Sequence, residues 1–242
     1  MSEWLFDLGN SRLKYARRGA DGTVGEMASL DHGNGDVASL PAQVQGEIAW
    51  VASVASPALR ARLLGELAQR FARISVARVQ PACAGLRIAY ADPARLGVDR
   101  FLALLAAREA GAAVLAVGVG TALTIDLLDA TGLHRGGRIA PSPTLMRESL
   151  QARASQLPAQ GGRYVEFADD TLDALASGCD GAALGLIERS RTEAEALLGT
   201  VPHLWFHGGG APALASRLDA AESRPRLVLE GLSRWAATAP RD

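Results

Sequence analysis

The sequence has few of the residues that would indicate a disulfide framework or a metal cage. Only Cys83 and Cys179 are cysteines among its 242 residues, which is too few for either arrangement. We therefore expect two reduced thiols. A Gly-x-Ser-x-Gly elbow is missing as well, which argues against a serine triad. The four histidines show no metal-ligand spacing; they are His32, His134, His203 and His207.

An excess of one charge and long apolar runs are also missing. The 25 lysines and arginines nearly balance the 26 acidic residues, for a net charge of -1, so the composition favours neither nucleic acid nor an anionic membrane as a partner. No charge-free apolar run reaches 18 residues, and Glu3 and Asp7 stand where a signal peptide would need an apolar core. We therefore expect a cytoplasmic globular protein.

The amino-terminal part of the sequence predicts a β-hairpin followed by a βαβ unit. Residues 3–8 and 12–17 have the pattern of two strands around a Gly-Asn turn. The glycine-rich residues 20–46 predict an irregular connection with room for one more strand. Residues 47–79 then predict a strand, a helix beginning at Pro57 and a parallel strand.

The second part of the sequence repeats this pattern, because residues 112–132 predict a strand, a Gly-Thr turn and a return strand. There is no plain sequence repeat, so the duplication is an interpretation of the pattern. We expect an α/β protein with one half in residues 1–110 and the other in residues 111–242. The further elements expected are a helix at 97–111, a strand at 136–140, a helix up to about Ala154, one or two helices within 169–199, a strand at 203–207, a short helix at 212–218, and a strand followed by a helix at 226–237.

The stretch from Asp7 to Lys14, the first turn, could bind a phosphate. Gly9 and Asn10 let backbone N–H groups converge on an anion, and Ser11 and Lys14 add a hydroxyl and a cation. Asp7 could hold Mg²⁺, since hard cations take carboxylate oxygens and keep waters. A simple hairpin with an exposed lysine remains the alternative.

The stretch from Gly118 to Thr124, the second turn, again combines glycine with hydroxyls, at Gly120 and Thr121. Two such turns could hold the two ends of a triphosphate, whereas one alone would be ordinary. Neither turn matches a Walker A or a dinucleotide-binding glycine pattern. Asp126 and Asp129 follow on the return strand, where we expect solvent-exposed edge carboxylates.

Two further stretches allow both a structural and a chemical interpretation. Asp99 opens a helix, where it could simply cap the amino terminus beside a surface Arg100. Alternatively, Asp99 takes a proton from an attacking hydroxyl and Arg100 pairs with an anionic substrate. Gly208 and Gly209 follow an apolar strand, either as an ordinary connection or as a place where a flat ligand approaches the backbone.

Taken in order, the motifs of this sequence resemble those of one family, the type III pantothenate kinases. These bacterial enzymes phosphorylate pantothenate in the first step of coenzyme A synthesis. The resemblance extends from Asp7 to about Gly231. The motifs that carry it are Asp-x-Gly-Asn-Ser from Asp7, Tyr90 before Gly97-Val98-Asp99-Arg100, Gly-Thr-Ala-x-Thr from Gly120, Gly-Gly-x-Ile-x-Pro from Gly136, Thr171 before a glycine, and Gly-Gly-x-Ala from Gly208.

The resemblance implies a fold and a set of ligands. The fold would be two ribonuclease H-like halves of the actin-like ATPase type, with the nucleotide cleft between them. The ligands would be pantothenate and ATP with Mg²⁺. The protein would be a homodimer whose substrate site is shared across the interface.

The resemblance also implies roles for the residues that match. Both turns, together with Gly208 and Gly209, would contact ATP, with Asp7 near Mg²⁺. The matching tyrosine and the Gly-Val-Asp-Arg segment would cradle pantothenate, with Asp99 as the catalytic base. Thr171 would meet pantothenate from the partner subunit.

Three positions depart from the family pattern. Gly118 stands where the family commonly has an aspartate that helps bind K⁺, so a K⁺ site is doubtful. Ser142 replaces a glycine and His207 replaces a threonine. Two alternatives therefore remain, a related small-molecule kinase or a regulatory or ligand-sensing protein with weakened catalysis. The joint presence of Asp7 and Asp99 favours an active kinase.

Overall fold

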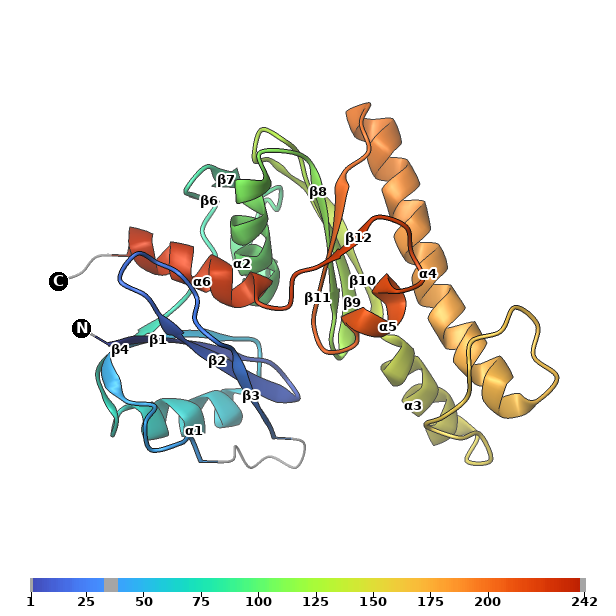
Figure 1. The fold of residues 1–242 in the computed structure, drawn as a ribbon, viewed down its shortest axis with the longest axis horizontal. Coiled ribbons are helices and arrows are strands. Elements are labelled where there is room, and N and C mark those ends of the chain that lie inside the picture. The colour runs from blue at the N-terminus through green and yellow to red at the C-terminus, as the bar shows by residue number, and fades with distance from the viewer. Residues whose placement is uncertain (1, 33–38, 240–242) are drawn as a thin grey trace. The chain divides into compact units, whose positions relative to one another are not determined.

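The computed structural model describes residues 2–32 and 39–239, so residues 33–38 of the expected irregular connection lie outside the described residues (Figure 1). The chain forms two compact units, which we call the first and the second unit. The first unit comprises Met1–Glu109, Gly132–His134 and Arg226–Asp242, and the second comprises Ala110–Thr131 and Arg135–Pro225.

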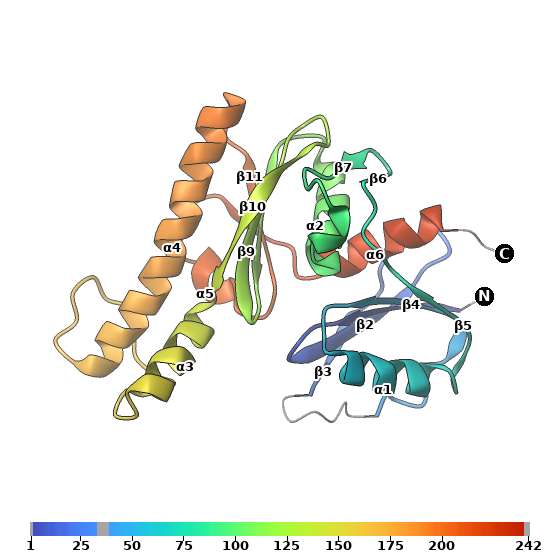
Figure 2. The ribbon, with the colours of Figure 1, turned by 180° about the vertical axis from the view of Figure 1, so that it is seen from behind.

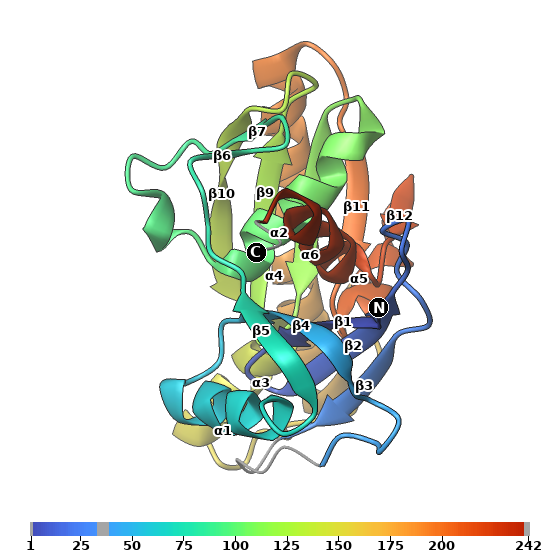
Figure 3. The ribbon, with the colours of Figure 1, turned by 90° about the vertical axis from the view of Figure 1, so that its left-hand side faces the viewer.

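The first unit is built on a five-stranded sheet in the order β3-β2-β1-β4-β5, which can be followed in Figure 3. The expected hairpin is confirmed as antiparallel β1 and β2, and the βαβ pairing as parallel β4 and β5. The strands are β1 (Glu3–Leu8), β2 (Arg12–Arg18), β3 (Ala28–Asp31), β4 (Gly46–Ser53) and β5 (Phe71–Val76).

One face of this sheet packs on α1 (Pro57–Leu67), which Ser56 caps by accepting a hydrogen bond from the Leu59 N–H group. Phe6 and Leu8 of β1 belong to the same buried cluster as the apolar side of α1. Because side chains alternate along a strand, Asp7 points to the opposite face. The burial of Phe6 and Leu8 against α1 therefore directs the Asp7 carboxylate to the face of the sheet away from α1.

The opposite face of the sheet is covered by α2 (Val98–Ala107) and α6 (Leu227–Thr238), which pack against each other. The Trp50 and Trp235 rings meet edge to face with centroids 6.0 Å apart. Trp50 and Arg18 both donate to the Glu3 carboxylate, at 2.8 and 2.9 Å. Arg18 also donates to the Ser233 hydroxyl at 3.0 Å, which joins α6 to the hairpin.

The prediction of a strand followed by a helix at 226–237 is wrong, because α6 occupies the stretch from Leu227 onward. The strand lies earlier, as β12 (Ala221–Ser223). The apolar residues of this stretch belong to a helix that is largely buried. A short apolar run in a buried helix cannot be distinguished from a buried strand by periodicity alone. The remaining elements of the first unit are short: β6 (Ala82–Cys83), β7 (Leu86–Arg87) and a 3₁₀ turn at Pro93–Arg95. A second 3₁₀ turn, Arg108–Ala110, ends on the first residue of the second unit.

The second unit repeats the strand order of the first, as β10-β9-β8-β11-β12. Again the first two strands form an antiparallel hairpin, and the fourth pairs in parallel with the first. The repeated design inferred from the sequence pattern is thus confirmed. The strands are β8 (Val114–Val119), β9 (Ala122–Leu128), β10 (His134–Pro141), β11 (His203–His207) and β12.

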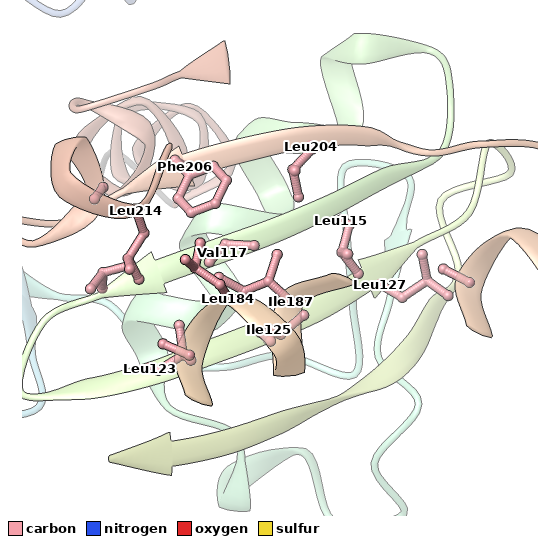
Figure 4. Close-up of a cluster of buried hydrophobic side chains, with 14 residues drawn as sticks. Leu115, Val117, Leu123, Ile125, Leu127, Leu184, Ile187, Leu204, Phe206 and Leu214 are labelled. Atoms are coloured by element: carbon pink, nitrogen blue, oxygen red, sulfur yellow. The ribbon is translucent and has the colours of Figure 1, made fainter. Parts of the chain in front are cut away.

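One long helix, α4 (Thr171–Leu198), covers one face of the second sheet, with α3 (Pro143–Arg153) beside it (Figure 2). The short α5 (Ala211–Ala215) follows β11. Figure 4 shows the core, where leucine, isoleucine, valine and phenylalanine side chains of β8, β9 and β11 meet α4 and α5. Cys83 and Cys179 are both buried free thiols, as expected.

No helix within the described ranges is both long enough and apolar enough to cross a membrane.

The close packing of α2 and α6 yields a stability prediction. A methyl group at Gly231 would overlap the backbone carbonyl of Leu102, and backbone cannot move aside as a side chain can. We expect Gly231→Ala to lower the free energy of unfolding by about 1–3 kcal/mol. The matched control is Gly65→Ala in α1, where nothing lies within 4 Å of the added methyl, so helix propensity should raise stability by roughly 0.5–1 kcal/mol. Urea unfolding followed by circular dichroism measures both, and equal effects would contradict the prediction.

Candidate active site

The first feature of the site is a pair of carboxylates from distant parts of the sequence, Asp7 on β1 and Asp99 in the first turn of α2. Asp7 is buried, and Lys14 stands opposite it on β2. Burial raises the pKa of Asp7 from 3.8 to about 6, with Lys14 opposing the rise and the Asp99 carboxylate adding to it. The two carboxylates are therefore close enough to interact.

The first turn is fixed by hydrogen bonds from His32, a residue that the sequence analysis did not identify as part of the site. The Gly9 N–H donates to the Arg12 carbonyl at 3.0 Å, closing the hairpin. His32, which is 3% exposed, donates from Nε2 to the Gly9 carbonyl at 3.0 Å, and its backbone N–H donates to the Ser11 carbonyl at 3.1 Å. Asn10 and the Ser11 side chain are left on the exposed side. No motif signals His32, because its partner is a backbone carbonyl 23 residues away.

Gly97 positions Asp99 at the start of α2. Gly97 is the N-cap residue and Asp99 lies in the first turn, where its carboxylate accepts the Arg100 N–H at 2.9 Å. A Cβ at Gly97 would lie 2.6 Å from Oδ1 of Asp99. The glycine therefore leaves the space that the carboxylate needs, and Asp99 is not itself the N-cap residue. Its negative charge still suits the helix amino terminus.

The alternative of a surface Arg100 is wrong, since the side chain is 6% exposed. Its Nη1 donates to the Tyr90 hydroxyl at 3.2 Å, and its guanidinium lies 5.9 Å from the centre of the Tyr90 ring. Tyr90 in turn stacks on the buried His134, with centroids 5.8 Å apart and planes 23° apart. A row from His134 through Tyr90 to Arg100 thus fixes a buried cation next in sequence to Asp99.

In the second unit, the expected nucleotide-binding segments meet at the ends of parallel strands β8 and β11. The Gly210 N–H donates to the Val119 carbonyl at 3.0 Å, and Gly208 adopts φ +96° beside the same carbonyl, where a side chain would overlap. The Ser142 N–H donates to the Thr121 carbonyl at 3.4 Å, bringing the start of α3 to the second turn. Gly120 and Gly209 are exposed at this edge.

Thr171 lies at the start of a helix, whereas the other candidate residues of the second unit lie in turns at strand ends. It is the first residue of α4, exposed, and follows Asp170, whose carboxylate caps the helix by accepting from two backbone N–H groups.

The prediction of exposed carboxylates at Asp126 and Asp129 is wrong, since they are 3% and 6% exposed. Asp129 accepts from the Thr131 N–H at 2.9 Å, the Thr131 hydroxyl at 2.7 Å and Arg135 Nε at 2.8 Å. These bonds close the turn between β9 and β10, so the role of Asp129 is structural. A strand-end aspartate followed by threonine and glycine could have signalled this turn.

The carboxylate pair of the first unit fits Mg²⁺. Among the described residues, no three histidine, cysteine or acidic side chains gather as a metal cluster. Mg²⁺ does not need one, because it is usually held by one or two carboxylates, substrate phosphates and water. Two interacting carboxylates, one of them with a pKa raised to about 6, would be stabilised by a cation.

The raised pKa of Asp7 predicts how stability depends on pH. The native state keeps the Asp7 proton up to about pH 6, whereas the unfolded chain releases it near 3.8, so stability falls as pH rises through this window. Two pKa units correspond to about 3 kcal/mol. We therefore expect Asp7→Asn to raise the free energy of unfolding by about 1–3 kcal/mol at pH 7 and to change it little at pH 4.

The matched control is Asp21→Asn. Hydrogen bonds from Thr23 lower the pKa of Asp21, so this variant should lose stability at pH 7 rather than gain it. Urea unfolding at both pH values makes the comparison. If Asp7→Asn loses stability at pH 7, or gains as much stability at pH 4 as at pH 7, the burial of Asp7 does not raise its pKa as assigned.

Solved structures with the same architecture identify the fold. A conserved Baf family protein from Campylobacter jejuni matches with a TM-score of 0.66 at 20% identity, over 97% of each chain. A protein from Sinorhizobium meliloti named as a 2-dehydro-3-deoxygalactonokinase matches with a TM-score of 0.55 at 15% identity, over 97% of this chain and 98% of that one. The expected α/β fold of two ribonuclease H-like halves, that of the actin-like ATPases and sugar kinases, is confirmed.

Sequence relatives identify the family. The sequence profile of type III pantothenate kinases matches residues 4–193. A type III pantothenate kinase of Stenotrophomonas maltophilia (strain R551-3) is 59% identical over 242 residues, covering 99% of each chain. One from Xanthomonas axonopodis pv. citri (strain 306) is 58% identical over 241 residues, again covering 99% of each chain. This chain belongs to the type III pantothenate kinase family.

Proposed function

We propose that this protein transfers the γ-phosphoryl group of ATP to pantothenate, giving 4'-phosphopantothenate in the first step of coenzyme A biosynthesis. The observation that carries the proposal is the interacting pair of Asp7 and Asp99 in the first unit, beside the buried Arg100. The relatives support pantothenate as the substrate, because proteins named type III pantothenate kinase match this chain over nearly its whole length.

Asp99 is the proposed catalytic base. It would accept the proton of the primary hydroxyl of pantothenate as that oxygen attacks the γ-phosphorus of ATP. A new P–O bond forms, the bond to the β–γ bridging oxygen breaks, and ADP leaves. Positioning and charge neutralisation supply most of the rate in such transfers. Gly97 supports this role because it leaves the carboxylate room at the open end of α2.

Arg100 is the proposed partner of the pantothenate carboxylate. A buried guanidinium forms strong charge-assisted hydrogen bonds with a carboxylate. The Tyr90 hydroxyl already accepts one N–H of Arg100, and His134 supports the tyrosine ring from the other side. Such a fixed cation would hold the substrate by its acid end and leave its hydroxyl end for Asp99. Gly97 and Val98 would line the same cradle.

ATP would contact exposed turns in both units. In the first unit, Gly9, Asn10, Ser11 and Lys14 would bind phosphate. Gly120, Thr121, Gly208 and Gly209 would do so in the second unit, where backbone hydrogen bonds hold the two strand-end turns together. Asp7 would hold Mg²⁺, which when bound offsets phosphate charge. Lys14, opposite Asp7 on the hairpin, would add a further positive charge at the same place.

The proposed enzyme is a homodimer in which Thr171 completes the partner's pantothenate site. Large apolar side chains are exposed near this residue, since Phe167 is 98% exposed and Leu172 39% exposed. We take these side chains as part of the proposed interaction surface, and a second copy of the chain is the occupant that fits the shared site. We also propose two domains, residues 1–110 and 111–242 as expected from the sequence, except that α6 joins the first domain because it packs on α2. The cytoplasmic location stays a prediction.

The proposed reaction is tested with purified protein, Mg-ATP and pantothenate, detecting the product by mass. The parent should form phosphopantothenate. Asp99→Asn should lower kcat by roughly 10²–10⁴-fold, because it removes the base. Asp92→Asn is the matched control, since Asp92 only caps the turn at Pro93–Arg95, and it should leave kcat within about twofold. A folded parent that binds ATP yet yields no product would contradict the kinase and favour the regulatory alternative.

Complementation tests the shared site. Asp99→Asn and Thr171→Arg should each be nearly inactive alone. Mixed under conditions that exchange subunits, they form heterodimers in which one site carries both changes and the other carries neither. An equimolar mixture should therefore recover about a quarter of the parent activity. Activity that stays at the level of the separate variants would contradict a site completed by Thr171 of the partner subunit, and sedimentation gives the oligomeric state in the same samples.

A further inference from the structure

Gly118 lies in the second sheet between two polar side chains. In the register of the strands it is opposite Thr124 on β9 and opposite His207 on β11. A Cβ at Gly118 would lie 2.6 Å from Thr124 Oγ1, and 2.9 Å from both Cε1 and Nε2 of His207. The space that a side chain at position 118 would occupy is therefore taken by a hydroxyl and an imidazole ring.

These three residues lie on the face of the sheet away from α4. Val117, Ile125 and Phe206, one position away on each strand, point into the core under α4 (Figure 4). Strand alternation sends Gly118 and its two neighbours to the other face. They also stand at the strand ends, because β8 continues into the second turn and His207 is followed directly by the Gly208 turn. The imidazole thus stands beside both of the proposed phosphate-binding turns of this unit.

The residues at this place do not fit a monovalent cation. In the family that the sequence resembles, the residue at this position is commonly an aspartate that helps bind K⁺. Gly118 offers no carboxylate, and the space that a side chain would need there is occupied by Thr124 and His207. Hard cations take oxygen ligands, whereas an imidazole nitrogen suits transition metals. The three atoms nearest to a Cβ at Gly118 belong to one hydroxyl and one imidazole, and no carboxylate oxygen is among them.

We propose that the His207 imidazole replaces the monovalent cation, donating an N–H hydrogen bond to a phosphate oxygen of bound ATP, so that ATP binding needs no K⁺. This inference rests on the proposed binding of ATP at the second turn. A neutral imidazole carries an N–H on one of its two ring nitrogens and a protonated imidazole carries one on both, so the ring can donate to the phosphate in either form when the nitrogen that faces the phosphate carries the N–H. Gly118 is a positioning residue here, because any larger side chain would displace the ring.

The test measures the Kd of a non-hydrolysable ATP analogue with Mg²⁺ by calorimetry. The two buffers contain either KCl or tetramethylammonium chloride at equal ionic strength. The parent should give the same Kd in both, within about twofold. His207→Ala should weaken binding about tenfold in both salts, the effect of losing one hydrogen bond to a charged group. His207→Gln keeps an N–H donor and should retain most of the affinity.

Two further variants sharpen the test. His203→Ala changes an exposed histidine of the same strand that pairs with Glu222, and it should leave Kd unchanged. The double variant Gly118→Asp with His207→Thr removes the ring and supplies a carboxylate beside the Thr124 hydroxyl. Its affinity for the analogue should become K⁺-dependent, tightening about tenfold or more when KCl replaces tetramethylammonium chloride.

Two results would overturn the proposal: K⁺ tightening the parent's binding by tenfold, or His207→Ala leaving Kd unchanged in both salts. If His207→Ala does not fold, as circular dichroism would show, the double variant decides, and K⁺-independent binding there counts against the proposal. Phosphopantothenate is measured in the same buffers. A parent that binds the analogue through His207 but makes no product would leave this inference standing and remove the proposed function.

Discussion

The site depends on holding a carboxylate out of water. Asp7 is fixed on a strand whose other face is the apolar contact with α1, so it cannot rotate toward solvent without disturbing that core. Covered by the opposite layer of the unit and next to Asp99, it keeps its proton up to about pH 6. A group held in this state gains more from a nearby cation than an exposed aspartate would. The stability that the folded protein loses by ionising Asp7 is therefore a cost that the proposed Mg²⁺ would offset.

The rest of the first unit supplies the rigidity that this arrangement needs. Glu3, at the far end of the same strand, accepts hydrogen bonds from Trp50 and Arg18, and Arg18 reaches Ser233 on α6. Truncating one partner of such a buried network leaves a charge unpaired, which costs several kcal/mol. The network ties α6 to the sheet, and α6 packs against α2, the helix that carries Asp99.

Local signals in the sequence predict the hairpins, the glycine turns and the helix starts, because these depend on neighbours within a few residues. Contacts between distant residues were not predictable in this way. Arg100 is buried because Tyr90 and His134 surround it, and His32 acts on a carbonyl 23 residues away. Asp126 and Asp129 resemble exposed strand-edge residues in sequence, yet both are buried. The site motifs were found through family resemblance. The contact of Gly118 with Thr124 and His207 could be recognised only from the register of three strands in the structure.

The membership of α6 in the first unit has a consequence for biosynthesis. Its residues, Leu227–Thr238, follow the whole second unit in sequence, yet they cover the sheet face that carries Asp7. As a nascent chain emerges from the ribosome, the second unit can bury its core while the first sheet still lacks half of its helical layer. The carboxylate pair acquires its final surroundings only after nearly the entire chain has been translated. A partly synthesised chain would thus lack the environment that we assign to the proposed phosphoryl transfer.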